Sequence, residues 1–200
     1  MDPVLARLLD EVGEPSLERD ASRVGGDGVN DHYGALVRAI VGQQLSVNAA
    51  RAIYGRLIDL FDGRPPTPQE LLDQDPEQMR TAVGLSHAKV AFLRSLAEHV
   101  ISGELDLDHL RELSDEDVVA ALTAVKGLGE WTSHMFLMFQ LDRPDVLAVG
   151  DLGIRRAVER AYELPDLPSA DELAKLAESW RPYRSAACRL LWRSLSNSPE

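Results

Sequence analysis

The sequence predicts an all-α fold, and three observations lead to that prediction. Apolar residues recur at helical spacing along most of the chain, for example from Leu36 to Val41 and again at Ile53, Leu57 and Leu60. Residues that favour helix starts precede several of these apolar runs. No stretch alternates between apolar and polar residues for long enough to predict a β-strand.

Four helix starts are marked by capping residues. Thr67 is followed by proline and, three positions on, by glutamate, and Asp75 is followed by the same kind of pattern. An oxygen at the N-cap accepts from the free backbone N–H groups of the first turn, where proline is also tolerated. Ser114 and Ser169 resemble the start of capping boxes, with acidic residues in the first turn, where the helix dipole favours them.

The composition is that of an ordinary globular protein. Its 200 residues fit one domain or two small lobes around one core, with 44% apolar and 27% charged residues. Cys188 is the single cysteine, which excludes an internal disulfide, a four-cysteine zinc site and a four-cysteine iron–sulfur cluster. No apolar run approaches the roughly 20 residues of a membrane helix, so we expect a cytoplasmic protein that does not bind membranes.

The net charge argues against a broadly basic nucleic-acid-binding surface. The chain carries 21 basic and 33 acidic residues, a formal charge of −12, whereas surfaces that bind phosphate usually show a basic excess. Part of the acidic excess lies in the first turns of predicted helices. Any contact with nucleic acid must therefore come from local basic residues or from backbone N–H groups.

The most informative segment begins at Ser114. One predicted helix ends at Lys126 and the next begins directly after Gly129, so a Gly-Leu-Gly turn joins them into a hairpin. Gly127 and Gly129 permit positive φ angles and let another backbone approach closely. The N–H groups of this turn and of the following helix N-terminus form an anion site, which suits a nucleic-acid phosphate. A plain turn between two helices is the alternative interpretation.

Asp151 stands in an apolar setting, as the one charged residue between Asp145 and Arg155. A carboxylate in such surroundings needs a partner or a function. Two interpretations are open: Asp151 caps the helix that begins near Leu152, or it is a catalytic residue. They are compatible, because a cap bond also orients the carboxylate.

The order of these motifs resembles that of the helix–hairpin–helix DNA glycosylases of the HhH-GPD superfamily, in particular the 3-methyladenine DNA glycosylase II type. The resemblance covers about Tyr33 to Leu195 and rests on Leu122–Thr132, on Asp151 22 residues beyond Gly129, and on Val37–Val47, Gly84–Lys89 and Trp180–Ala187. It implies a compact bacterial form with a two-lobed helical fold and an active-site cleft between the lobes. Residues 31–200 would form the glycosylase domain, with the hairpin at about 114–141, after an N-terminal helix and loop at 1–30, the loop being Arg19–Asn30.

The activity implied by the resemblance is the removal of alkylated bases, such as 3-methyladenine, from double-stranded DNA in base excision repair. Members that also cut the strand carry a lysine two residues after the second hairpin glycine, where this chain has Trp131. Without that amine no Schiff base forms, so a monofunctional enzyme is implied, acting as a monomer at the nucleoid. N-alkylated purines carry positive charge and leave readily, so one carboxylate suffices to stabilise the sugar cation once the base is flipped out.

The resemblance also assigns roles to individual residues. Asp151 is the expected catalytic carboxylate, and the expected base pocket consists of Trp131, Trp192, Met135 and Tyr183. Contacts to DNA are expected from Gly127, Gly129, Lys126, Thr132, Gln43, Gln44, Leu45 and Arg155, with Lys89, Arg156, Arg181 and Arg184 as further candidates. The corner at residues 43–45 would supply the wedge that fills the gap left by the flipped base. No catalytic cofactor is expected, but a structural Na⁺ or K⁺ is implied near the backbone carbonyl groups of Gly127 and Gly129.

Several alternatives remain open at this point. Trp192 shares an apolar stripe with Cys188 and Leu191, so it is either a core residue or part of the pocket. The whole chain could instead be a non-catalytic helix–hairpin–helix DNA-binding module, in which Asp151 is only a cap. A glycosylase for oxidised or mismatched bases and an acidic helical interaction protein are the other two alternatives.

Overall fold

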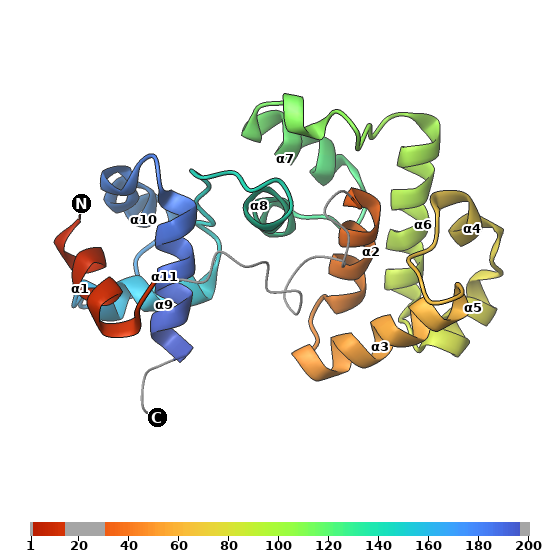
Figure 1. Ribbon diagram of the computed structural model, residues 1–200, viewed down its shortest axis with the longest axis horizontal. Helices are drawn as coiled ribbons and strands as arrows, with labels where there is room; N and C mark the ends of the chain where they lie inside the picture. The colour runs from red at the N-terminus through yellow and green to blue at the C-terminus, as the bar shows by residue number, and fades with distance from the viewer. Residues whose placement is uncertain (1, 15–30, 197–200) are drawn as a thin grey trace. The chain divides into compact units, whose positions relative to one another are not determined.

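The computed structural model describes residues 2–14 and 31–196 (Figure 1). Throughout these residues the chain forms helices joined by turns and loops, without a β-strand. The prediction of an all-α fold is therefore confirmed. The loop expected at Arg19–Asn30 lies outside the described residues. Within the described part of the chain, no helix is long and apolar enough to cross a membrane.

The chain divides into two compact units. The first unit consists of Met1–Glu18 and Asp142–Glu200, and the second of Arg19–Leu141. The first contains α1 (Pro3–Val12), α9 (Leu152–Ala161), α10 (Ala170–Leu176), the 3₁₀ helix η2 (Ala177–Trp180) and α11 (Arg184–Ser196). The second contains α2 (His32–Gly42), α3 (Val47–Leu60), α4 (Pro68–Asp73), α5 (Pro76–Val83), α6 (His87–Ser102), the 3₁₀ helix η1 (Leu110–Glu112), α7 (Asp115–Ala124) and α8 (Glu130–Phe139).

The helix caps predicted from the sequence are present. Thr67 and Ser169 each form a complete capping box, in which the hydroxyl and the glutamate three residues on bond each other's backbone N–H groups. Asp75 caps α5 with a 2.8 Å bond to a first-turn N–H. Ser114 caps α7 at 3.1 Å, but Asp117 bonds the Ser114 hydroxyl, so this box is only half formed.

In the first unit, α11 packs against α9, and α1 packs against α11 (Figure 1). Cys188 and Leu191 of α11 and Ile154 of α9 are fully buried in this core. Arg7 of α1 donates a hydrogen bond of 2.7 Å to the carbonyl oxygen of Ala161, the last residue of α9. Because the last carbonyl groups of a helix lack partners within it, this bond both caps α9 and anchors α1. The N-terminal helix thus belongs to the same unit as the C-terminal helices.

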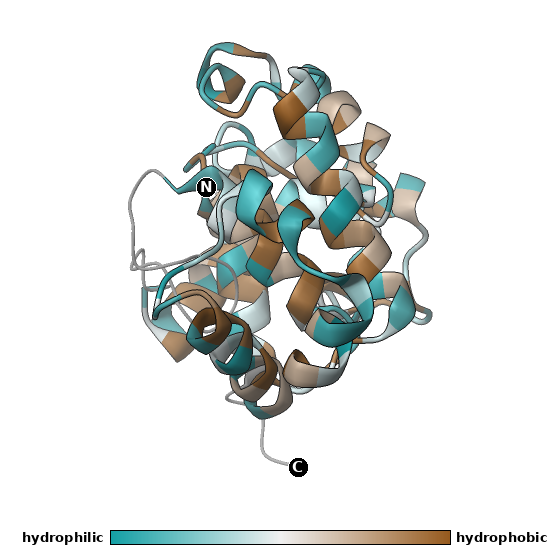
Figure 2. Ribbon diagram, turned by 90° about the vertical axis from the view of Figure 1, so that its right-hand side faces the viewer, coloured by the Kyte–Doolittle hydropathy of each residue, from teal (hydrophilic) through white to brown (hydrophobic). Residues whose placement is uncertain are grey.

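In the second unit, α2 is the most deeply buried helix. Its residues 32–37, together with Ile40 and Val41, are all buried. It packs against α3 and lies between α6 and α8 (Figure 1). The surrounding helices carry both hydrophilic and hydrophobic bands, as expected when one side of a helix faces a core (Figure 2). The position of α2 is therefore fixed by packing against three helices.

Candidate functional site

The carboxylate of Asp151 is held at the start of α9 in the first unit. Asp151 is the N-cap residue, and its Oδ1 accepts a hydrogen bond of 2.8 Å from the backbone N–H of Ile154. The indole Nε1–H of Trp192, on α11, donates to the same oxygen at 2.9 Å. The predicted cap is therefore present, and Trp192 adds a second donor from 41 residues further along the chain.

The surroundings of this pair leave little room for another side chain. A Cβ atom built on Gly153 would lie 3.0 Å from Oδ1 of Asp151 and 3.4 Å from Nε1 of Trp192, so a larger residue would have to push the pair aside. Burial, reinforced by the charge of Asp151, raises the pKa of the Cys188 thiol to about 12. The thiol stays neutral at physiological pH and adds no second negative charge near Asp151.

This arrangement suits a carboxylate that acts electrostatically. Two donors on one oxygen fix the direction of the Asp151 side chain at the N-terminal end of α9. A carboxylate oriented in this way can stabilise a positive charge that develops during a reaction, or position a water molecule for attack.

The Gly-Leu-Gly turn lies in the second unit and joins α7 to α8. Gly127 has a φ angle of 93°, in the left-handed region that glycine adopts readily. Leu128 is buried and anchors the turn, whereas Lys126 and Gly129 are exposed. Gly129 is the N-cap residue of α8, which therefore has no side-chain cap bond. The positive end of the α8 dipole thus carries no side-chain cap, and Lys126 adds a positive charge near it.

The carbonyl groups of Gly127 and Gly129 do not fit the monovalent cation expected there. The Gly129 oxygen accepts from the backbone N–H of Ser133 at 3.0 Å and from its hydroxyl at 3.1 Å, which uses both lone pairs. The Gly127 oxygen accepts from Nε2 of Gln43 at 2.8 Å, so a positively polarised N–H group lies where the cation would be. We therefore assign no ion to these two groups.

Residues 43–45 form the turn between α2 and α3. Gln43 is the C-cap residue of α2, and Gln44 has a φ angle of 58°, which is uncommon for a residue other than glycine. Gln44 is exposed, and Leu45 keeps 37% of its surface exposed. Ser46 caps α3 by accepting from the N–H of Ala49 at 3.4 Å. The tip of the turn thus presents one amide and one apolar side chain to solvent.

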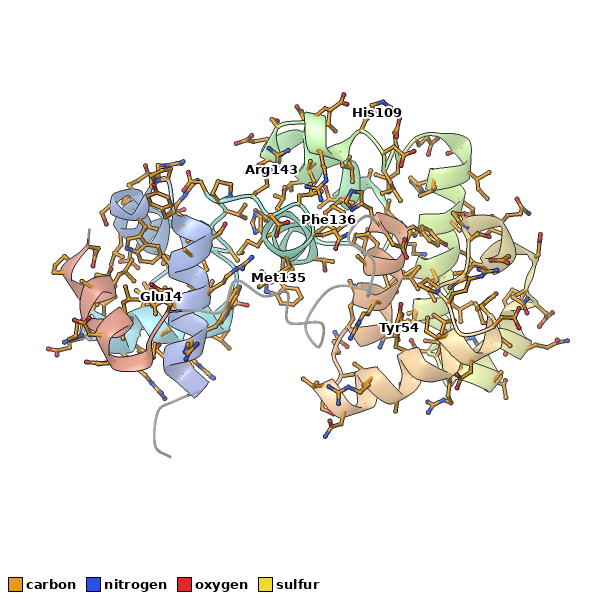
Figure 3. The ribbon with its side chains drawn as sticks, in the orientation of Figure 1. Glu14, Tyr54, His109, Met135, Phe136 and Arg143 are labelled. Atoms are coloured by element: carbon orange, nitrogen blue, oxygen red, sulfur yellow. The ribbon has the colours of Figure 1, made fainter. Side chains whose placement is uncertain are left out.

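The residues expected in the base pocket differ in exposure. Trp131, in the first turn of α8, is 49% exposed, and Tyr183, just before α11, is 67% exposed. Met135 is only 4% exposed and lies, like its neighbour Phe136, among the buried residues of α8 (Figure 3). Trp192 is partly buried, so it lies at the edge of the core, where its indole contacts Asp151. Of these four residues, only Trp131 and Tyr183 present a large aromatic surface to solvent.

Several residues expected at the DNA surface are engaged within the protein. Arg155 donates from Nε to a backbone carbonyl oxygen at 2.7 Å. Arg184 forms an ion pair of 2.7 Å with Asp145, which Arg181 also contacts at 2.6 Å. Thr132 is buried, so a DNA contact from its side chain is not supported.

Two pairings near these residues could not be predicted from the sequence. The bonds from Trp192 to Asp151 and from Gln43 to Gly127 join residues 41 and 84 positions apart. The one sequence signal for the first pair is Gly153, two residues after Asp151, since a glycine early in a helix often makes room for a neighbour. The second pair has no local signal.

The chain matches a known protein family over the region that contains Gln43, Gly127 and Asp151. Residues 37–182 match the family model described as "HhH-GPD superfamily base excision DNA repair protein". The chain is 40% identical over 164 residues to DNA-3-methyladenine glycosylase 1 of Schizosaccharomyces pombe, a match that covers 81% of this chain and 72% of the relative.

Solved structures resemble the chain over almost its whole length. One is the S. pombe 3-methyladenine DNA glycosylase Mag1 in complex with abasic DNA, with a TM-score of 0.85, 35% identity, and coverage of 99% of this chain and 94% of that chain. Another is a DNA-3-methyladenine glycosidase from Bacillus halodurans, with a TM-score of 0.85, 36% identity, and coverage of 98% and 86%.

Proposed function

The chain belongs to the HhH-GPD superfamily of base excision DNA repair proteins, and from that premise we propose that it is a monofunctional DNA glycosylase for N-alkylated purines such as 3-methyladenine. Its partner is double-stranded DNA, on which it acts as a monomer. The similar proteins named above carry the name of that activity, and one of them was solved with abasic DNA. The observation that carries the catalytic part is the pair of hydrogen bonds that orient the Asp151 carboxylate.

The chemistry matches what a single oriented carboxylate can supply. A base inside a duplex is out of reach, so the target nucleotide must be flipped out at a cost of a few kcal/mol. An N-alkylated purine already carries positive charge, and it leaves without strong help from a general acid. As the bond to the sugar breaks, positive charge develops on the sugar ring. Asp151 stabilises that charge and orients the water that replaces the base.

Trp131 fits the recognition of a positively charged base. Its indole is half exposed in the first turn of α8, two residues after Gly129. An electron-rich aromatic ring attracts a cation over its face, and this attraction favours alkylated purines over neutral ones. The position holds no amine, so no Schiff base can form there with the abasic sugar. Strand cleavage is therefore not part of the proposed activity.

The hairpin offers a way to bind DNA despite the net charge of −12. The first N–H groups of α8 and the exposed Lys126 form a local anion site that needs no arginine cluster. Contacts to phosphate position a protein on the duplex without reading its sequence. Such a contact suits an enzyme that must act wherever a damaged base occurs.

The direct test is to incubate alkylated duplex DNA with the protein and identify the released bases by mass spectrometry. The expected result is free 3-methyladenine and an abasic strand that breaks only after alkali is added. Borohydride should trap no covalent adduct, and a trapped adduct would contradict the monofunctional assignment. A protein that binds the duplex but releases no base would be a non-catalytic DNA-binding module instead.

A further inference from the structure

A single side-chain amide joins two segments that are far apart in the sequence. Nε2 of Gln43, at the end of α2, donates a hydrogen bond of 2.8 Å to the carbonyl oxygen of Gly127 in the hairpin turn. Both residues are only partly buried, and both belong to the second unit. The bond therefore connects the turn between α2 and α3 directly to the hairpin.

Helix α6 supports both ends of this connection. Nζ of Lys89 donates to the carbonyl oxygen of Val41 at 2.7 Å, two residues before Gln43. Three residues later on α6, the ring of Phe92 lies against Gly127, where an added Cβ atom would collide with the ring. Residues three apart on a helix lie on the same side. Lys89 and Phe92 thus form one platform under the end of α2 and under the hairpin.

The turn that contains Gln44 and Leu45 is exposed to solvent and has a defined backbone conformation. Gln44 adopts a left-handed conformation, and the N–H of Leu45 donates to the carbonyl oxygen of Gly42 at 3.3 Å. In the hairpin, the N–H of Leu128 donates to the carbonyl oxygen of Val125 at 3.1 Å. Each turn is therefore closed by its own backbone bond, and the side chain of Gln43 adds a hydrogen bond from one turn to the other.

We propose that Gln43 is a positioning residue, whose amide fastens the α2–α3 turn to the hairpin so that the two segments meet DNA as one rigid surface. The DNA contacts of these segments rest on the proposed function, but the fastening is a property of the free protein. A phosphate held at the hairpin would set the position of the protein on the duplex. The fastening would transmit that position to Gln44 and Leu45, where an error of about 1 Å can cost roughly a hundredfold in rate.

Two substitutions of Gln43 distinguish the contribution of its hydrogen bond from the contribution of its side-chain shape. Gln43→Met keeps the length of the side chain but removes the donor. Gln43→Glu keeps the shape almost unchanged, but it replaces the donor with a carboxylate that repels the Gly127 oxygen. If only shape mattered, Glu would behave like Gln. If the donor matters, both variants should lose the fastening, and Glu should lose more. Gln78→Met, on the exposed side of α5, is the matched control.

The first readout is hydrogen exchange in the free protein. The amide protons of Leu45 and Leu128 should exchange roughly tenfold faster in Gln43→Met, and faster still in Gln43→Glu, because a lost hydrogen bond leaves the two turns free to open separately. The control should leave both rates unchanged. Wild-type exchange rates at Leu45 and Leu128 in both variants would overturn the proposal. This readout holds even if the protein fails to release bases, which would contradict only the proposed function.

The second readout is base flipping, measured by the fluorescence of 2-aminopurine placed beside an abasic analogue in a duplex. Both Gln43 variants should show a several-fold smaller signal, measured at saturating protein so that a change in DNA affinity does not contribute. In a Gln44→Ala background, Gln43→Met should cause no further loss, because it acts through that turn. A full further loss in this background would show that Gln43 does not act by positioning the turn.

Discussion

The indole Nε1–H of Trp192 and the backbone N–H of Ile154 both bond Oδ1 of Asp151, at 2.9 and 2.8 Å. The second bond belongs to the start of α9, and the first comes from α11, which packs against α9 in the same unit. Two rigid helices therefore determine the direction of one carboxylate. Because both bonds are made to a carboxylate oxygen, each is stronger than a hydrogen bond between two neutral groups.

Trp192→Phe should lower the rate of base excision while leaving the fold intact. Phenylalanine keeps most of the ring packing but has no N–H to donate to Asp151. A hydrogen bond to a charged group contributes about 1.5–3 kcal/mol, so the single-turnover rate should fall about tenfold or more. In an Asp151→Asn background the same substitution should have little further effect. An equal loss in both backgrounds would show that Trp192 acts independently of Asp151.

Gly153→Ala should lower the rate of base excision but leave the thermal stability nearly unchanged. The new Cβ atom would lie 3.0 Å from Oδ1 of Asp151, so the carboxylate must move by a few tenths of an ångström. Alanine is favoured over glycine in helices by up to about 1 kcal/mol, which offsets the strain. We expect a several-fold slower single-turnover rate and a nearly unchanged unfolding temperature. Gly150→Ala is the control, since nothing lies within 4 Å of its Cβ position. An equal loss of rate in Gly150→Ala would show that contact with Asp151 is not the cause of the loss in Gly153→Ala.

His134 should make the free energy of unfolding depend on pH. Burial lowers the pKa of His134 below its usual 6.5, although the charges of Glu130 and Asp115 oppose this effect. The neutral form is therefore favoured in the folded protein, and the stability that this provides is lost as the pH falls below about 6.5. His134→Gln should flatten the decrease in stability between about pH 7 and pH 5, as measured by urea unfolding.

The control for this measurement is His109, whose pKa is shifted in the opposite direction from that of His134. A hydrogen bond with Asp106 raises the pKa of His109, so its contribution is present at low pH and is lost as the pH rises through the folded value. His109→Gln should therefore make the decrease toward acid slightly steeper. If His134→Gln leaves the pH dependence of the wild type unchanged, the burial of His134 has no consequence for stability.

The sequence predicted those features that depend on neighbouring residues. The caps at Thr67, Ser169 and Asp151 were predictable because a capping side chain bonds an N–H only two or three positions away. The hairpin was also predictable from neighbouring residues, because Gly127 and Gly129 separate two clear helical apolar patterns. The family resemblance extended this local evidence to the catalytic role proposed for Asp151.

The features that could not be predicted depend on tertiary packing. The position of Trp192 in an apolar stripe favoured core and pocket equally, and only the packing of α11 on α9 shows that its N–H bonds Asp151. The amide of Gln43 similarly finds Gly127 across 84 residues. The cation expected at Gly127 and Gly129 was not supported because that prediction could not include the donors that already bond these carbonyl groups.

Asp151→Asn tests whether the carboxylate of Asp151 stabilises the sugar cation during base release. The amide is nearly the same shape, so it keeps a cap at the start of α9, but it removes the negative charge that would face the sugar cation. Losing one oriented electrostatic contact costs on the order of 3–4 kcal/mol, so the rate should fall at least about a hundredfold. Binding of DNA should be retained, because the hairpin is unchanged.

The measurement is the single-turnover rate of 3-methyladenine release from alkylated duplex by wild type and Asp151→Asn, with DNA affinity and thermal unfolding measured on the same samples. The expected result is a folded variant that binds the duplex as tightly as the wild type, or slightly more tightly, and releases almost no base. A folded variant that releases 3-methyladenine at the wild-type rate would show that Asp151 is a helix cap alone.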